Sequence, residues 1–460
     1  MTNLTIKQQK ELHVTGHSGS SIWEVHRILL VVLLSYWINN LLLTKQLQLS
    51  WILRFTLEFL TLVFPFLVSI TFTQFTKYIL ILQISIIIMS TVSKSSHPRL
   101  KSSHRHLPYI VAFRGYLQLI TIAAILAVDF HVFPRRFAKT ETFGTSLMDV
   151  GVGMFIFSSG LVSGLRLSND KVNWDYLMKT LRIIFPCILL GFGRMISVKV
   201  LDYQEHVSEY GVHWNFFVTL AIIPILVLIQ KFILPLNSFL IALLSSASKL
   251  PFFVNESVYQ YCLKFKGLED YILNTPRIDF LSQNREGLFS LIGFYSIYLI
   301  AFDLGSKLMT HHQKKTMLEL RNNRIITLLR YTIFLSAMYF CLTFALQLEV
   351  SRRMANFPFV IWVSALCSTM LLSLFLIDDC FSVPNVPIIL TSINQNQLAI
   401  FLFANILTGL INLTVNTLNF NHLQAFAILI VYLYVVGLVA ALLHRWNITL
   451  KFNNDINATG

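Results

Sequence analysis

The sequence predicts an all-α polytopic membrane protein with about thirteen transmembrane helices. Only 13% of its 460 residues are charged, whereas soluble domains carry about 25%. The mean hydropathy is +0.65. Apolar stretches recur with lengths near the roughly 20 residues that a helix needs to cross a bilayer. Together these features favour helices that are surrounded by lipid.

The predicted spans follow the apolar stretches in order. They lie near 22–43, 51–72, 75–92, 112–132, 147–165, 180–200, 214–231, 232–248, 286–305, 326–347, 357–377, 397–417 and 422–443. The boundary between the seventh and eighth spans is weak, because Lys231, Pro235 and Asn237 suit either a tight turn or a kink inside one long helix. No linker divides the chain, so 22–443 is predicted as a single transmembrane domain.

The polar ends of the chain are predicted to lie outside the membrane. Residues 1–21 lack the apolar region of a cleavable signal peptide and are typical of a solvated, lumenal tail. Ser21 and Glu24 have the spacing of a capping box that would start the first helix. Residues 444–460, which follow the last span, are predicted as a cytosolic tail.

The orientation follows from the charges in the loops. The segments 93–108 and 306–324 are both strongly basic and fall on the same side of the predicted spans. The positive-inside rule makes that side cytosolic, so the N-terminus is lumenal and the C-terminus is cytosolic. The acidic loop 201–212 and the segment 250–285 are then lumenal. The mixed charges and aromatic residues of 250–285 suit an interfacial amphipathic helix.

Composition argues against several classes of function. The net charge of +14 does not indicate nucleic-acid binding, because basic residues of a membrane protein gather in its loops. The five cysteines are scattered and predict neither a disulfide framework nor a zinc site. The sequence also lacks a phosphate-binding P-loop, a dinucleotide fingerprint and a metal-ligand spacing. We therefore expect no metal and no bound cofactor.

Asp129 is the first candidate for chemistry. It ends a run without charges that starts at Gly115, and it lies about 22 Å along a helix from Arg114. Pro134 ends the helix, and Lys139 follows where a turn could fold it back. An acid at the end of a membrane span is costly and is by default a functional hypothesis. The Asp129–Lys139 pair suits either general-base chemistry or a structural ion pair that closes a helix terminus.

The fifth predicted span contains a second acid and several glycines. Ser146 and Asp149 form a capping box, which accounts for Asp149 structurally. Gly160 and Gly164 have the small-xxx-small spacing of closely packed helices. The same glycines could also form a smooth groove for an acyl chain.

The candidates for substrate binding are polar side chains inside or beside the predicted spans: Arg135, Arg136, Arg194, His213, Asn394 and Asn396. Arg194 is a cation within the sixth span, so it must face protein, a polar cavity or a ligand phosphate. His213 suits an interfacial residue better than a catalyst. Asn394 and Asn396 suit either a polar head-group pocket or hydrogen bonds between helices. The adjacent Arg352–Arg353 pair could bind a phosphate or anchor a helix.

Several stretches together resemble one known family, the inositol acyltransferase of GPI-anchor biosynthesis (phosphatidylinositol-glycan class W) in its fungal form. The resemblance is carried by Ala127-Val-Asp-Phe130 and Arg135-Arg-Phe-Ala-Lys139, and further by 14–21, 144–153, 191–194, 202–215, 284–287 and 394–397. These stretches are spread in order over nearly the whole chain.

The resemblance implies an enzyme of the endoplasmic reticulum membrane, with 22–443 as its acyltransferase domain. It would transfer a fatty acyl group, typically palmitoyl, from acyl-CoA to the inositol 2-hydroxyl of glucosaminyl-phosphatidylinositol. The family's acid–base pair would fall on Asp129 and Lys139, with Asp129 as general base. Acyl-CoA is then a co-substrate, cationic side chains would hold its phosphates, and the membrane lipids are the other partners.

Two rival functions follow from the residues without the resemblance. A lipid transporter or flippase could use Asp129 as a proton or substrate site, although the odd number of spans and the lack of a visible repeat count mildly against it. A lumenal lipid-linked glycosyltransferase would need an acidic pair in an early lumenal loop, and the sequence has none there.

Overall fold

The computed structural model describes residues 6–43, 49–92, 107–167, 174–200, 207–233, 238–247, 271–309, 316–380 and 386–450. Within these ranges all regular elements are helices, so the all-α class is confirmed. The helices that precede the loop 128–146 are α1 (Ile6–Val14), α2 (Ile22–Leu43), α3 (Trp51–Glu58), α4 (Phe64–Thr71), α5 (Thr76–Val92) and α6 (Pro108–Ala127). A π-helical turn, Phe59–Val63, joins α3 to α4 into one continuous span.

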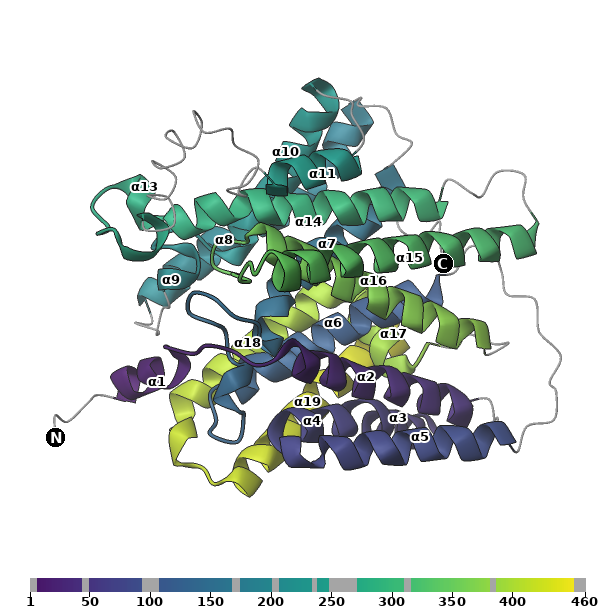
Figure 1. Cartoon of the computed structure of the whole chain (residues 1–460). Helices are drawn as coiled ribbons and strands as arrows, with labels where there is room; N and C mark the ends of the chain where they lie inside the picture. The colour runs from purple at the N-terminus through teal and green to yellow at the C-terminus, as the bar shows by residue number, and fades with distance from the viewer. Residues whose placement is uncertain are drawn as a thin grey trace.

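The loop 128–146 leads from α6 into the second part of the bundle. The helices there are α7 (Leu147–Leu167), α8 (Trp174–Val200), α9 (Val207–Tyr210), α10 (Phe216–Ile233), α11 (Ser238–Ala247), α13 (Phe280–Gln283), α14 (Arg285–Met309), α15 (Met317–Phe340), α16 (Phe357–Cys380), α17 (Ile388–Gln395), α18 (Gln397–Thr414) and α19 (His422–Arg445). The long helices lie side by side as a bundle, with α6 in its middle (Figure 1).

Eleven helices of the described residues are long and apolar enough to cross a membrane. The predicted seventh and eighth spans correspond to the shorter helices α10 and α11. The residues that separate these two helices, 234–237, lie outside the described ranges, as do residues 250–270 of the expected interfacial segment 250–285. The multi-pass architecture is thus confirmed, with eleven spans by length and composition where about thirteen were expected. The sidedness of the two termini stays a prediction.

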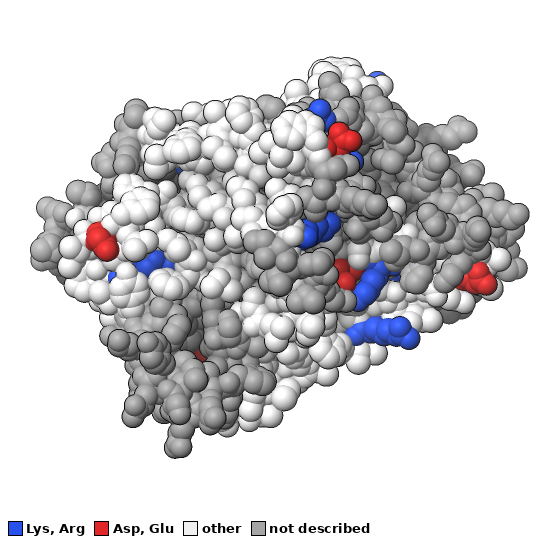
Figure 2. Space-filling view, turned by 90° about the horizontal axis from the view of Figure 1, so that it is seen from above, with Lys and Arg blue, Asp and Glu red and all other residues white. Residues whose placement is uncertain are grey.

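Burial separates the core of the bundle from its outer surface. The share of a candidate span that is buried inside the protein is 83% for α16 and 78% for α6. It is only 11% for the span that contains α5 and 17% for α18. The helices α6 and α16 therefore form the core, and α5 and α18 present apolar side chains outward. Figure 2 shows a broad uncharged area on one long face, with charged side chains at its left edge and in its right half. Such a face suits contact with lipid.

The helices α7 and α14 pack with their backbones almost in contact. A Cβ atom at Gly160 would collide with the carbonyl oxygen of Tyr298, and one at Gly164 with that of Phe302. On the other side, a Cβ at Gly305 would meet the backbone of α7 at Leu161. The helix-packing interpretation of these glycines is therefore confirmed. Their surfaces are covered by α14, so an acyl groove at these two positions is ruled out in this conformation.

The N-terminal segment packs against the loop 128–146, and the expectation of a solvated tail is wrong for its described residues. Ser20 N–H donates to the Thr145 carbonyl at 2.6 Å, and Glu141 N–H donates to the His17 carbonyl at 3.0 Å. Gly19 and Gly144 have φ angles of +90° and +124° at this crossing, where a Cβ would meet backbone atoms of the other segment. Glycine is needed there because the two chains approach so closely.

The start of α2 follows the capping prediction only in part. Ser21 Oγ accepts a hydrogen bond from Trp23 N–H at 3.2 Å, so Ser21 does cap the helix. Glu24, however, does not close the expected box. Its carboxylate binds the guanidinium of Arg136 at 3.1 Å instead, which ties the start of α2 to the loop 128–146.

Candidate functional site

The chain after α6 is held by a single arginine side chain. The guanidinium of Arg135 donates to the carbonyls of Val128 at 2.8 Å, Phe130 at 2.8 Å and Phe133 at 2.7 Å. It also reaches the His13 carbonyl of the N-terminal segment at 3.3 Å. Carbonyls at a helix end otherwise lack partners, so Arg135 stabilises the turn that carries Asp129. The donors of this predicted substrate-binding residue are thus directed at the protein's own main chain.

Asp129 lies just beyond the end of α6 and is 8% exposed. Its Oδ2 accepts a hydrogen bond of 2.7 Å from Nδ2 of Asn412 in α18. Burial raises the pKa of the Asp129 carboxyl to about 6, although the bond from Asn412 and the charges of Lys10 and Arg135 act in the opposite direction. A carboxyl with a pKa near neutrality is suited to accept a proton from a hydroxyl group.

Lys139 does not contact Asp129, and the prediction of a direct pair is wrong. Its Nζ binds Oε1 of Glu209, in the short helix α9, at 2.7 Å. The two groups diverge because Asp129 turns toward α18, whereas Lys139 follows a 3₁₀ turn, Arg135–Phe137, and faces α9. Lys139 keeps 33% of its side chain exposed, and Glu209 keeps 13%. A substrate could therefore reach the ammonium group.

Glu209 is the centre of a group of cations. Arg352 Nη1 lies 3.8 Å from Glu209 Oε1. Burial alone would raise the pKa of Glu209, but the charges of Lys139, Arg352 and Arg194 outweigh it and bring the pKa to about 2. Two of the predicted site residues, Lys139 and Arg194, thus act on the same carboxylate. Glu209 was missed because it is one of several acids in the loop 201–212 and has no motif of its own.

The network continues from Arg352 to a completely buried acid, Asp149. Arg352 Nε binds Asp149 Oδ1 at 2.8 Å, and Thr140 Oγ1 donates to Asp149 Oδ2 at 2.9 Å. Ser146 Oγ accepts the Asp149 N–H at 3.1 Å, so the capping role predicted for Ser146 is confirmed. The cap does not account for the carboxylate of Asp149, which belongs to the network. Because Thr140 follows Lys139 in the chain, Lys139, Glu209, Arg352, Asp149 and Thr140 form a closed ring, here called the Arg352 ring.

A second buried carboxylate lies beside the Arg352 ring. Glu286, in the first turn of α14, is fully buried and binds Arg353 Nη2 at 2.8 Å and Arg277 Nη1 at 2.9 Å. Arg285 Nε lies 3.6 Å from it. The adjacent Arg352 and Arg353 therefore serve different carboxylates. This answers the question left open for the arginine pair: both side chains anchor the chain before α16 to buried acids.

Two further predicted residues lie at the same end of the bundle. Arg136 is exposed, with Nε bonded to Glu24 and Nη2 to Thr73 Oγ1 at 3.0 Å. The His213 ring stacks on Phe280 with ring centroids 5.9 Å apart, and the main-chain N–H of His213 donates to Asn284 Oδ1 at 2.8 Å. The His213 ring thus packs α13 against the start of α10. The interfacial interpretation of His213 stays a prediction.

Asn394 and Asn396 lie at the other end of the bundle, so they do not share a head-group pocket with Asp129. Asn396 bonds the chain after α19, through Nδ2 to the Ile448 carbonyl at 2.9 Å and through Oδ1 from Leu450 N–H at 2.7 Å. Their neighbour Gln397 accepts a bond of 2.7 Å from Arg114, near the start of α6. Asp129 follows the far end of that helix, roughly 22 Å away along its axis. The alternative of hydrogen bonds between segments is thus confirmed for Asn396.

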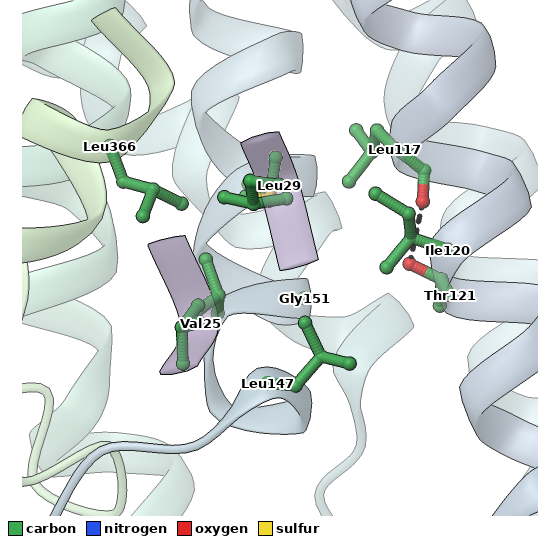
Figure 3. Close-up of a pocket in the computed structure, with 10 residues that line it drawn as sticks. Val25, Leu29, Leu117, Ile120, Thr121, Leu147, Gly151 and Leu366 are labelled. Atoms are coloured by element: carbon green, nitrogen blue, oxygen red, sulfur yellow. Dashed lines mark hydrogen bonds between the residues drawn. The ribbon is translucent and has the colours of Figure 1, made fainter. Parts of the chain in front are cut away.

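A small apolar cavity lies between α2, α6, α7 and α16, next to the first turn of α7 (Figure 3). Its volume is about 10 Å³, which is the space of one water molecule. Gly151 and Thr121 face it, together with leucine side chains such as Leu29 and Leu366. This cavity is far too small for an acyl chain.

The comparisons with known proteins match the chain over almost all of its length. The GWT1 family model matches residues 6–443. The chain is 36% identical to GPI-anchored wall transfer protein 1 of Yarrowia lipolytica, over 97% of this chain and 99% of that protein. It is 34% identical to the protein of the same name in Candida albicans, again over 97% and 99%. The resemblance inferred from the sequence is confirmed, and the chain belongs to the GWT1 family.

Proposed function

We propose that the protein acts in GPI-anchor biosynthesis at the endoplasmic reticulum membrane, as an acyl-CoA-dependent O-acyltransferase. It transfers a palmitoyl group from acyl-CoA to the inositol 2-hydroxyl of glucosaminyl-phosphatidylinositol. The relatives' name, GPI-anchored wall transfer protein 1, supports the pathway. The observation that carries the chemistry is Asp129, a nearly buried carboxyl with a pKa of about 6 at the boundary of a span.

In the proposed reaction Asp129 removes the proton of the inositol hydroxyl as its oxygen attacks the thioester carbonyl. The new ester bond forms as the carbon–sulfur bond breaks, and the sulfur leaves as the thiolate of CoA. One Asp129 oxygen, Oδ2, is held by Asn412. The other oxygen, Oδ1, is the acceptor for the hydroxyl proton. A general base of this kind contributes about 10²- to 10⁴-fold to a rate.

In this reaction Lys139 does not pair with Asp129 but stabilises the oxyanion. Glu209 fixes one side of its ammonium group at 2.7 Å, and an ammonium group carries three donors. The remaining donors stabilise the oxyanion of the tetrahedral intermediate. The cations around Glu209, including Arg194 and Arg352, supply a positive field for the phosphates of the two substrates.

Purified protein in detergent tests this function directly. Palmitoyl-CoA and a glucosaminyl-phosphatidylinositol analogue are supplied, and the acylated product and released CoA are measured together. We expect equal amounts of both from the wild type, and at least tenfold less from Lys139→Met. The exposed Lys77, in the first turn of α5, provides the control Lys77→Met with unchanged rate. A lipid transporter would give neither product, and that result would overturn the proposal.

A further inference from the structure

A lysine from the N-terminal helix lies beside Asp129. Lys10 of α1 is only 8% exposed, and its Nζ donates to the main-chain oxygen and to Oδ1 of Asn412, each at 3.1 Å. Asn412 in turn donates from Nδ2 to Asp129 Oδ2 at 2.7 Å. Three segments that are far apart in the sequence thus meet in one chain of contacts, Lys10–Asn412–Asp129.

The burial of Lys10 needs a cause. Lysine is among the residues that are most rarely buried, and a buried ammonium group is costly unless it is paired. A nine-residue polar helix such as α1 could place Lys10 in water at no cost. Instead α1 is fixed over the site by the His13 carbonyl, which binds Arg135, and by the His13 ring, which packs edge-on against His131 at 4.6 Å.

We propose that Lys10 is a positioning residue for Asp129 and that α1 is a structural part of the acyl-transfer site. This inference rests on the proposed function, in which Asp129 is the general base. An ammonium group is only a donor, so Lys10 can bind only the oxygen of the Asn412 side chain. The amide is thereby turned with Nδ2 toward Asp129. This orientation occupies Oδ2 and leaves Oδ1 for the substrate hydroxyl.

The charge of Lys10 has a second effect on Asp129. The charged and titratable groups that act on this carboxyl are Lys10 from α1, Arg135 from the loop after α6 and Tyr432 from α19. Burial disfavours the carboxylate, and the two cations partly offset that cost. Loss of Lys10 therefore raises the pKa of Asp129. The base then becomes available only at higher pH.

Asn412 also begins a sequon for N-glycosylation, Asn412-Leu-Thr414. Glycosylation would modify Nδ2 of Asn412, the atom that donates to Asp129. In the folded protein this atom is occupied by the site. Thr414 lies two residues after Asn412, and its hydroxyl donates to the Leu410 and Ile411 carbonyls of its own helix. The substitution Thr414→Ala therefore removes the sequon but keeps the contact.

The test is the pH dependence of acyl transfer by the full-length protein with palmitoyl-CoA. We expect Lys10→Met to move the acidic limb of the profile upward by about one pH unit, as the loss of a neighbouring charge does. Lys10→Arg should restore the wild-type limb. Asn412→Ala should move the limb in the same direction, and the double variant should shift it by less than the sum of the two single shifts, because the two residues share one contact although the charge of Lys10 also acts on Asp129 directly. Thr414→Ala and Lys77→Met should leave the profile unchanged.

The outcomes separate the two proposals. If Asp129→Asn retains the wild-type rate, the proposed base is wrong and the role of Lys10 is wrong with it. If Asp129→Asn is inactive but Lys10→Met and Asn412→Ala keep the wild-type limb, only the inference about Lys10 is overturned. A merely structural role of α1 would lower the amount of folded protein or the rate at every pH. It would not move the limb.

Discussion

Removing Arg352 should destabilise the protein more than any exposed charge change. Arg352 lies 2.8 Å from Asp149 and 3.8 Å from Glu209. At an effective dielectric constant of about 20 these distances correspond to attractions of about 6 and 4 kcal/mol. Desolvation of the guanidinium offsets much of this gain, and breaking a buried pair by removing one partner costs about 3–5 kcal/mol. We therefore expect Arg352→Leu to lose about 3–5 kcal/mol.

The assay is reversible unfolding of the purified protein in mixed micelles, with Arg136→Leu as the matched exposed control. Because Arg136 is exposed, its substitution should cost about 1 kcal/mol or less. The double variant Arg352→Leu/Asp149→Leu should recover much of the loss, since it leaves no uncompensated carboxylate in the core. A loss below about 1 kcal/mol for Arg352→Leu, or simple additivity in the double variant, would refute the role of the Arg352 ring.

Three further predictions follow from the site and the core. Acyl transfer should fall to half its plateau near pH 6 on the acidic side, where Asp129 becomes protonated; a half-point near pH 4 would show an unperturbed carboxyl. The pKa of Glu209 is lowered to about 2, so its stabilising effect is complete above the unfolded value of 4.5 and is lost as the pH falls. The free energy of unfolding of Glu209→Gln should therefore depend less on pH than that of the wild type between about pH 5 and 2. If the two free energies change equally with pH, the ion pairs of Glu209 do not stabilise the fold. Gly164→Val should cost about 1–3 kcal/mol by overpacking against Phe302, whereas Gly193→Ala, which meets no atom within 4 Å, should be neutral; equal melting temperatures would contradict the close packing.

The sequence predicts well whatever depends on neighbouring residues. Apolar length located the spans, the small-xxx-small spacing located the closely packed face of α7 but not its partner α14, and Ser146 caps α7 as expected. Asp129 was singled out because a charge at the end of a span is costly wherever it lies. Each of these signals is contained within one segment of about twenty residues.

The partners of the site residues could not be found in this way. Asp129 binds Asn412, which lies 283 residues later, and Lys139 binds Glu209, 70 residues later. Hydropathy gives the ends of the helices but not which ends lie together. Lys10 was missed for a related reason, because a polar segment of low hydropathy is indistinguishable from a solvated tail until its contacts are known.

The rate of Asp129→Asn tests the central claim most directly, because asparagine keeps the size of the side chain but cannot accept the hydroxyl proton. Single-turnover transfer of palmitoyl from palmitoyl-CoA to glucosaminyl-phosphatidylinositol is compared with the wild type, alongside the melting temperature of each protein. If Asp129 is the general base, the rate of Asp129→Asn should be about 10²- to 10⁴-fold lower than that of the wild type, with the fold retained. A rate within fivefold of the wild type, in equally folded protein, would contradict it.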